Sequence, residues 1–123
     1  MKTSVFDGLT VGDDIPALTM PPLSRLTLAL YCGASGDHNP IHVDTDFAHS
    51  AGMPDVIAHG MLTMGRAIQV VTNWVGDPTA VIDYSVRMTR PVVVPNTAEG
   101  SIVSFTGKVA QINADGTIQV DLG

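Results

Sequence analysis

The feature that most constrains this chain is a change of hydrophobic period near residue 77. Before it, apolar side chains recur at helical spacing through residues 57–76, IAHGMLTMGRAIQVVTNWVG. After it, the pattern changes to alternation and β-branched residues in AVIDYSVRMT, IVSFTGKVAQI and TIQVDL. One long apolar helix followed by consecutive strands predicts an α+β fold, in which an antiparallel sheet wraps around a central helix.

Shorter elements are predicted on both sides of this long helix. A lead-in strand is expected around Leu9, followed by a helix that begins after the N-cap Ser24 and ends near Gly33. DTDFAHSAG, residues 44–52, predicts a second short helix. Asp115–Gly116 predicts a hairpin between the last two strands. The apolar face of the long helix is expected to comprise Met61, Met64, Ala67, Ile68, Val71 and Val75.

Length and charge restrict the domain count and the partners. A chain of 123 residues suits one domain, residues 1–123, with a single core. A net charge of −6 and scattered basic residues argue against binding to nucleic acid. Cys32 is the only cysteine, and no apolar run approaches the roughly 20 residues of a membrane span. We therefore expect a cytoplasmic protein with no membrane insertion.

The loop GDHNPIH, residues 36–42, gathers polar residues that permit three interpretations: a metal site, a proton-transfer site or a hydrogen-bonded turn. A metal site would use His38 and His42, but Pro40 between them disfavours the helix that such a pair requires. A nucleophile would be Ser35 or Cys32, and neither lies in a strand–nucleophile–helix turn. We therefore predict no metal.

The proton-transfer interpretation uses Asp37 and His42. The rigid Asn39–Pro40 turn between them can fix a carboxylate and an imidazole toward one substrate. An acid and a base that work near neutral pH are what the addition or removal of water at an activated double bond requires. A carboxylate and a histidine that only cap a turn are the alternative.

A second candidate site lies at His59–Gly60, at the start of the long helix. The Gly60 N–H would point out of the helix N-terminus, where a ligand can approach closely and negative charge is favoured. This arrangement suits an oxyanion hole for a thioester carbonyl, which contributes about 3 kcal/mol per donor. His59 itself is predicted to be a hydrogen-bonded structural residue rather than a catalyst.

YCGASGDHNPIHVDTDFA followed by IAHGMLTMG resembles the MaoC-like (R)-specific enoyl thioester hydratase family, whose motif has the form Y…SGDxNPxHxD. The likeness extends over about residues 31–95 and is greatest to the catalytic β subunit of actinobacterial (3R)-hydroxyacyl-carrier-protein dehydratases. It implies a hot-dog fold that pairs through its sheet with a second hot-dog subunit, as a homodimer or a heterodimer.

The resemblance also implies an activity and assigns residues to it. The expected reaction is reversible hydration between trans-2-enoyl and (R)-3-hydroxyacyl thioesters, carried on CoA or on the phosphopantetheine of an acyl carrier protein, with no cofactor. Asp37 and His42 match the catalytic pair, Gly60 matches the oxyanion-hole glycine, and Asn39 would support the loop. The rival activities are those of a hot-dog acyl-thioesterase and of a non-catalytic partner subunit.

One departure concerns the end of the sheet. Members of the family usually continue through a long final strand, whereas QVDLG barely begins one. Either the sequence lacks this final strand, or the sheet is completed in another way.

Overall fold

The computed structural model describes residues 5–123, and the chain divides into two compact units. The unit that contains the sheet, called the sheet unit below, comprises Met1–Thr19, Ala67–Ser85 and Ser104–Gly123. The second, called the site unit, comprises Met20–Arg66 and Val86–Val103. Helices and an antiparallel sheet together confirm the predicted α+β class.

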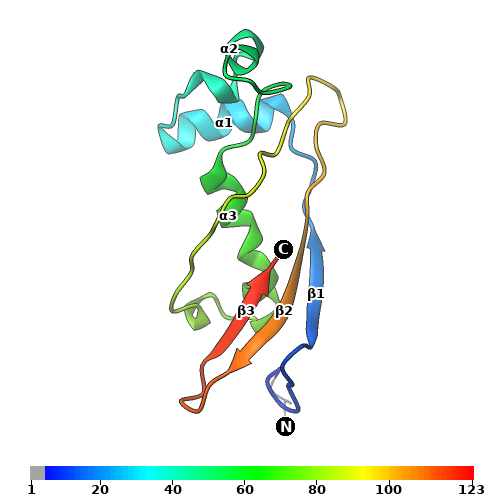
Figure 1. Cartoon of the computed structure of the whole chain (residues 1–123), viewed down its shortest axis with the longest axis vertical. Helices are drawn as coiled ribbons and strands as arrows, with labels where there is room; N and C mark the ends of the chain where they lie inside the picture. The colour runs from blue at the N-terminus through cyan, green and yellow to red at the C-terminus, as the bar shows by residue number, and fades with distance from the viewer. Residues whose placement is uncertain (1–4) are drawn as a thin grey trace. The chain divides into compact units, whose positions relative to one another are not determined.

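The sheet unit is a three-stranded antiparallel sheet in the order β1 (Asp14–Thr19), β2 (Ser104–Ile112), β3 (Ile118–Leu122), drawn in Figure 1. Alternate residues of β2 are buried, including Phe105 and Val109. α4 (Gln69–Val75) packs against β1 and β2. The absence of a side chain at Gly107 makes room for this packing, because a Cβ there would lie 2.6 Å from the Ile15 side chain and 3.1 Å from Val70.

The hairpin between β2 and β3 confirms the prediction at Asp115–Gly116. Gly116 has φ 88°, a conformation that glycine adopts without steric cost. The Asp115 carboxylate accepts hydrogen bonds from the backbone N–H and the hydroxyl of Thr117, and the Asn113 N–H closes the loop on the Thr117 carbonyl at 2.9 Å. The turn is thus fixed by local chemistry that the sequence displays.

The site unit contains α1 (Arg25–Ser35), the 3-10 turn η1 (Pro40–His42), α2 (Thr45–Ser50) and α3 (Gly60–Ala67), whose last residue is assigned to the sheet unit. Ser24 caps α1 as predicted, in a reciprocal box with Thr27. The short helix predicted within residues 44–52 is confirmed as α2, and Asp44 caps it by accepting hydrogen bonds from the N–H groups of Asp46 and Phe47. α1 extends beyond Gly33 to Ser35.

An apolar cluster between these elements forms the core of the site unit. Its buried members are Leu23, Leu28, Ala48, Val56, Ala58 and Val94. Backbone pairing ties the cluster together, because Ala58 N–H donates to Val92 O and Val94 N–H donates to Val56 O. Residues 56–58 are therefore held firmly, and they lead directly into α3.

The long helix is present as two consecutive helices, α3 and α4, with Ile68 between them. Ile68 keeps helical dihedrals, φ −65° and ψ −18°, and its carbonyl accepts from the N–H groups of both Val71 and Thr72. The expected apolar face is only partly covered, because Ala67 is buried whereas Met61 is 67% exposed.

Two of the predicted strands are wrong. Leu9 lies in a turn, where its N–H donates to Phe6 O, and β1 begins only at Asp14 because glycines with positive φ at positions 8 and 12 curve the chain. AVIDYSVRMT begins in the 3-10 turn η2 (Pro78–Ala80) and continues without helix or strand through residues 81–89, which pair with no strand of the described residues. β-propensity describes a side chain that suits a sheet and does not supply a partner strand.

Candidate active site

The loop that carries Asp37 is shaped by its own side chains. The Ser35 hydroxyl donates to Tyr31 O at 2.7 Å and accepts from the Asp37 N–H at 3.1 Å. Asp37 Oδ1 accepts from the Asn39 N–H at 3.2 Å, and Asn39 Oδ1 accepts from the Ile41 N–H at 3.1 Å. Consecutive side-chain-to-backbone bonds of this kind set a loop direction without regular structure. They leave Asp37 Oδ2 free to face the next turn.

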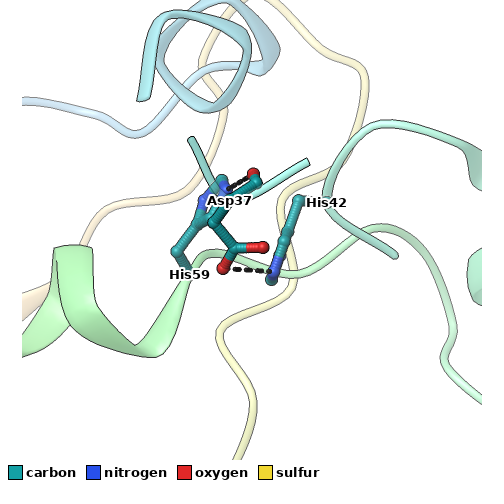
Figure 2. Close-up of side chains that lie close together, drawn as sticks. All are labelled: Asp37, His42 and His59. Atoms are coloured by element: carbon teal, nitrogen blue, oxygen red, sulfur yellow. Dashed lines mark hydrogen bonds and ion pairs between the residues drawn. The ribbon is translucent and has the colours of Figure 1, made fainter. Parts of the chain in front are cut away.

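His42 is buried and held in one tautomer by the backbone of residue 57. Its Nδ1 lies 2.7 Å from Ile57 O, and because a carbonyl can only accept, Nδ1 carries the proton. The other ring nitrogen, Nε2, lies 3.8 Å from Asp37 Oδ2 (Figure 2), and in the neutral form of the ring it presents a lone pair. This distance exceeds that of a direct hydrogen bond. Both groups can therefore bind one small molecule between them, such as a water.

A second histidine, His59, lies against this pair. Its ring is stacked on that of His42, with centroids 3.8 Å apart and planes at 21°, and it contacts the edge of Tyr31 at 4.6 Å. Its Nε2 lies 3.3 Å from Asp37 O and 3.4 Å from Cys32 Sγ. Burial, followed by the neighbouring His42, lowers the pKa of His59, opposed by its hydrogen bond to the Asp37 carbonyl. His59 is thus a neutral ring near pH 7.

Gly60 lies at the start of α3 and lines a pocket of about 290 Å³ together with His42. Thr63, Met88 and Arg90 line other parts of the same pocket. The first N–H groups of a helix have no acceptor within the helix, and the helix dipole places positive potential at that end. A Cβ on Gly60 would lie 3.6 Å from Met88 Cε, which is ordinary contact. Protein packing therefore does not demand glycine here.

A metal at this position would use Asp37, His42 and His59, whose ligand atoms lie within 4.8 Å of one another. Two stacked rings have in-plane lone pairs that run side by side, whereas a tetrahedral zinc site needs lone pairs that converge on one point. His42 Nδ1 and His59 Nε2 already face carbonyl oxygens. The donor set is therefore a poor fit to a metal ion. His38, which the rejected metal interpretation paired with His42, is exposed.

The structure brings together Asp37 and His42, and it places Gly60 in the wall of the pocket that His42 also lines. Asn39 lies in the loop between the pair. Sequence reasoning found the position of His59 but not its stacking on His42, and it missed Ile57, whose backbone carbonyl orients the catalytic candidate. No sequence signal identifies a backbone acceptor of this kind, because its position depends on the fold.

A separate finding concerns membranes: within the described residues, no helix is long and apolar enough to cross one.

The family description "MaoC like domain" matches residues 10–122 of the chain. The chain belongs to the MaoC-like domain family. The peroxisomal enoyl-CoA hydratase 2 of Arabidopsis thaliana is 41% identical over 93 residues, which are 69% of this chain and 30% of that protein. The family predicted from the GDHNPIH and HGM motifs is thereby confirmed.

Solved structures agree with this assignment. A MaoC-like dehydratase is 44% identical with a TM-score of 0.85, over 98% of this chain and 38% of that chain. One chain of the ChsH1–ChsH2 complex from Mycobacterium tuberculosis is 26% identical with a TM-score of 0.74, over 92% of this chain and 84% of that chain. The hot-dog fold is thus confirmed. This MaoC-like domain spans about a third of the length of the Arabidopsis relative and of the MaoC-like dehydratase.

Proposed function

We propose that this MaoC-like domain catalyses the reversible hydration of trans-2-enoyl thioesters to (R)-3-hydroxyacyl thioesters. The observation that carries the proposal is the geometry of the pair. His42 is fixed by Ile57 O with its Nε2 lone pair directed toward Asp37 Oδ2, 3.8 Å away, beside a pocket that includes the helix N-terminal Gly60. A base, an acid and an oxyanion donor are what the reaction requires.

In the hydration direction, the thioester carbonyl oxygen accepts a hydrogen bond from the Gly60 N–H. A water held between Asp37 and His42 loses a proton to the pair as its oxygen forms a bond to C3. The C2–C3 π electrons move toward the carbonyl, and the resulting enolate is stabilised at Gly60. The proton then passes from the pair to C2 on the same face. Dehydration reverses each step.

The reaction moves a proton and a hydroxide and no net electrons, so the proposal requires no nicotinamide, flavin or metal. CoA, or the phosphopantetheine of an acyl carrier protein, would supply the thioester. The activity named for the Arabidopsis relative supports this substrate class. Comparing turnover of an enoyl-CoA with that of the same acyl chain on an acyl carrier protein would identify which carrier this domain uses.

The proposed assembly contains a second hot-dog domain, either another copy of this chain or a different subunit. The ChsH1–ChsH2 complex is an example of such pairing among the structural neighbours. Residues 81–89 of this chain form no helix or strand and include large exposed apolar side chains, Ile82 at 79% and Met88 at 51%. Apolar surface of this kind favours a partner.

Loss of enoyl absorbance with trans-2-enoyl-CoA substrates of short and long chain tests the activity, beside Asp37→Asn and His42→Ala. We expect an (R)-3-hydroxyacyl product and a fall of about 10²–10⁴-fold in kcat for each variant. His49 is exposed, so His49→Ala serves as a control for the loss of a histidine and should leave kcat unchanged. Release of free thiol without hydration would indicate a thioesterase, and a folded wild type inactive on every chain length would contradict the proposal.

A further inference from the structure

His59 is one of the two buried polar side chains of the described residues, and the other is His42. Only 1% of His59 is exposed, yet its ring is in contact with both members of the proposed catalytic pair. It stacks on the His42 imidazole and its Nε2 faces the Asp37 backbone carbonyl at 3.3 Å. Figure 2 shows the three residues packed together. The mechanism above assigns His59 no proton transfer.

The hydrogen bonds of His59 settle its tautomer. A carbonyl oxygen only accepts, so the interaction with Asp37 O requires the proton on Nε2. Nδ1 is then a bare acceptor, and it is buried without a partner among the described residues. Protonation would place a charged N–H donor at that unpartnered position, which is costly in a buried site. The lowered pKa of His59, due first to its burial, agrees with a ring that stays neutral.

We propose that His59 is a positioning residue for the hydratase pair: a neutral buried ring that holds the His42 imidazole by stacking and the Asp37 backbone by its Nε2–H. The inference rests on the proposed function and extends it to a residue that transfers no proton. A planar neighbour 3.8 Å away restricts rotation of the His42 ring about its side chain. The Asp37 carbonyl, fixed by the same ring, sets where the carboxylate can reach.

This arrangement links two loops that have no helix or strand in common. Asp37 lies between α1 and η1, whereas His59 directly precedes α3. Tyr31, from the last turns of α1, also packs against the His59 ring in an edge-to-face arrangement, with ring centroids 4.6 Å apart. A side chain that is held by packing and in turn orients reacting groups is what an active site needs to keep geometry within tenths of an ångström.

Three variants separate the two contacts. His59→Phe keeps a ring for stacking and removes the donor to Asp37 O, His59→Gln keeps an amide donor and removes the ring, and His59→Ala removes both. We expect kcat to fall about 10²-fold in His59→Ala, because a displacement near 1 Å can have that effect, with KM little changed. The kcat values of His59→Phe and His59→Gln should lie between those of the wild type and His59→Ala. Both variants retain most of the buried volume, so the test does not depend on the alanine variant folding.

Cys32→Ala is the matched control, because Cys32 Sγ lies 3.4 Å from the same Nε2 and is also buried. Its removal leaves the Asp37 contact in place, so kcat should stay near the wild-type value. If Cys32→Ala instead reproduced the loss seen in His59→Ala, the positioning of Asp37 through its carbonyl would be overturned in favour of a general packing effect.

The decisive measurement is the ¹⁵N spectrum of the His42 ring in the free protein, which requires no turnover. We expect the wild type to show the Nδ1–H tautomer dictated by Ile57 O, and His59→Ala to show a mixture of tautomers. Unchanged His42 signals with unchanged kcat would overturn the inference, as would a change confined to KM. If no variant or wild type turns over substrate, the proposed function fails, while the spectra still decide whether His59 orients His42.

Discussion

The sheet unit and the site unit are stabilised by different kinds of contact. Strands β1–β3 pair by backbone ladders, β2 buries alternate side chains such as Phe105 and Val109, and α4 packs against β1 and β2. The site unit instead relies on side-chain-to-backbone bonds, at Ser24, Asn39 and Asp44, around an apolar cluster. Substitutions in the sheet unit should therefore alter stability alone, whereas those in the site unit can alter chemistry.

The largest contrast should come from Gly60→Ala in the site unit. The added Cβ meets only Met88, at ordinary contact distance, so the fold should be retained. The same methyl group stands beside the N–H where the thioester oxygen would bind, and kcat/KM should fall about 10²-fold because the substrate is displaced. Steady-state kinetics and a thermal melt measure the two effects.

Gly65→Ala is the matched control on the same helix, since a Cβ there meets nothing within 4 Å. Alanine is the better helix former, so this variant should be as active as the wild type and slightly more stable. Equal losses of activity in both variants would count against the oxyanion role of Gly60.

The converse substitution is Gly107→Ala in the sheet unit. Its Cβ would approach the Ile15 side chain to 2.6 Å and Val70 to 3.1 Å, so the packing of α4 on β1 and β2 must adjust. Overpacking of this kind costs about 1–3 kcal/mol of unfolding free energy. Urea denaturation should show this loss, while kcat of the remaining folded enzyme should match the wild type. If Gly107→Ala kept the wild-type urea midpoint but had a reduced kcat, the proposed division between a stability role for the sheet unit and a chemical role for the site unit would be wrong.

The elements that could be predicted are those determined by local chemistry. Ser24 and Asp44 cap their helices with their own oxygens, and Asp115–Gly116 fixes the hairpin through Thr117. Each signal lies within a few residues of the feature that it specifies. The residues of the GDHNPIH loop belong to the same class, because its internal hydrogen bonds are local.

The elements that could not be predicted depend on distant partners. Residues 81–89 have the composition of a strand, but within the described part of the chain they pair with no other strand. The stacking of His59 on His42 and the hydrogen bond from His42 to Ile57 O both join residues far apart in the sequence. The sequence predicts His59 to be a hydrogen-bonded structural residue, but only the fold decides which ring it meets.

A smaller effect is expected from Asn39, which the sequence assigned to loop support. Its Oδ1 accepts from the Ile41 N–H at the start of η1, an N-cap interaction whose loss costs about 1 kcal/mol. Asn39→Ala should lower stability by that amount and reduce kcat, because η1 carries His42. Asn39→Ser retains a capping oxygen and should recover most of both. A serine variant no better than alanine would argue against the capping role.

The smallest expected effect concerns the ion pair between Arg25 and Asp55 in the site unit. Asp55 Oδ1 accepts from the Val56 N–H at 2.8 Å and from Arg25 Nη2 at 2.5 Å, and also from the Thr45 hydroxyl. The Val56 hydrogen bond above all, aided by Thr45 and Arg25, lowers the pKa of Asp55 below 3.8. The folded state therefore binds this proton less readily than the unfolded state.

Because the folded pKa lies below the unfolded value, the stabilising contribution of Asp55 is present above pH 3.8 and is lost as the pH falls through the folded pKa. At neutral pH, Asp55→Asn should thus unfold at a lower urea concentration than the wild type. The two urea midpoints should converge as the pH falls below the folded pKa of Asp55. Side chains of the pair are about a quarter exposed, so the shift should be modest. An Asp55→Asn offset that is the same at every pH would instead place the contribution of Asp55 in packing rather than charge.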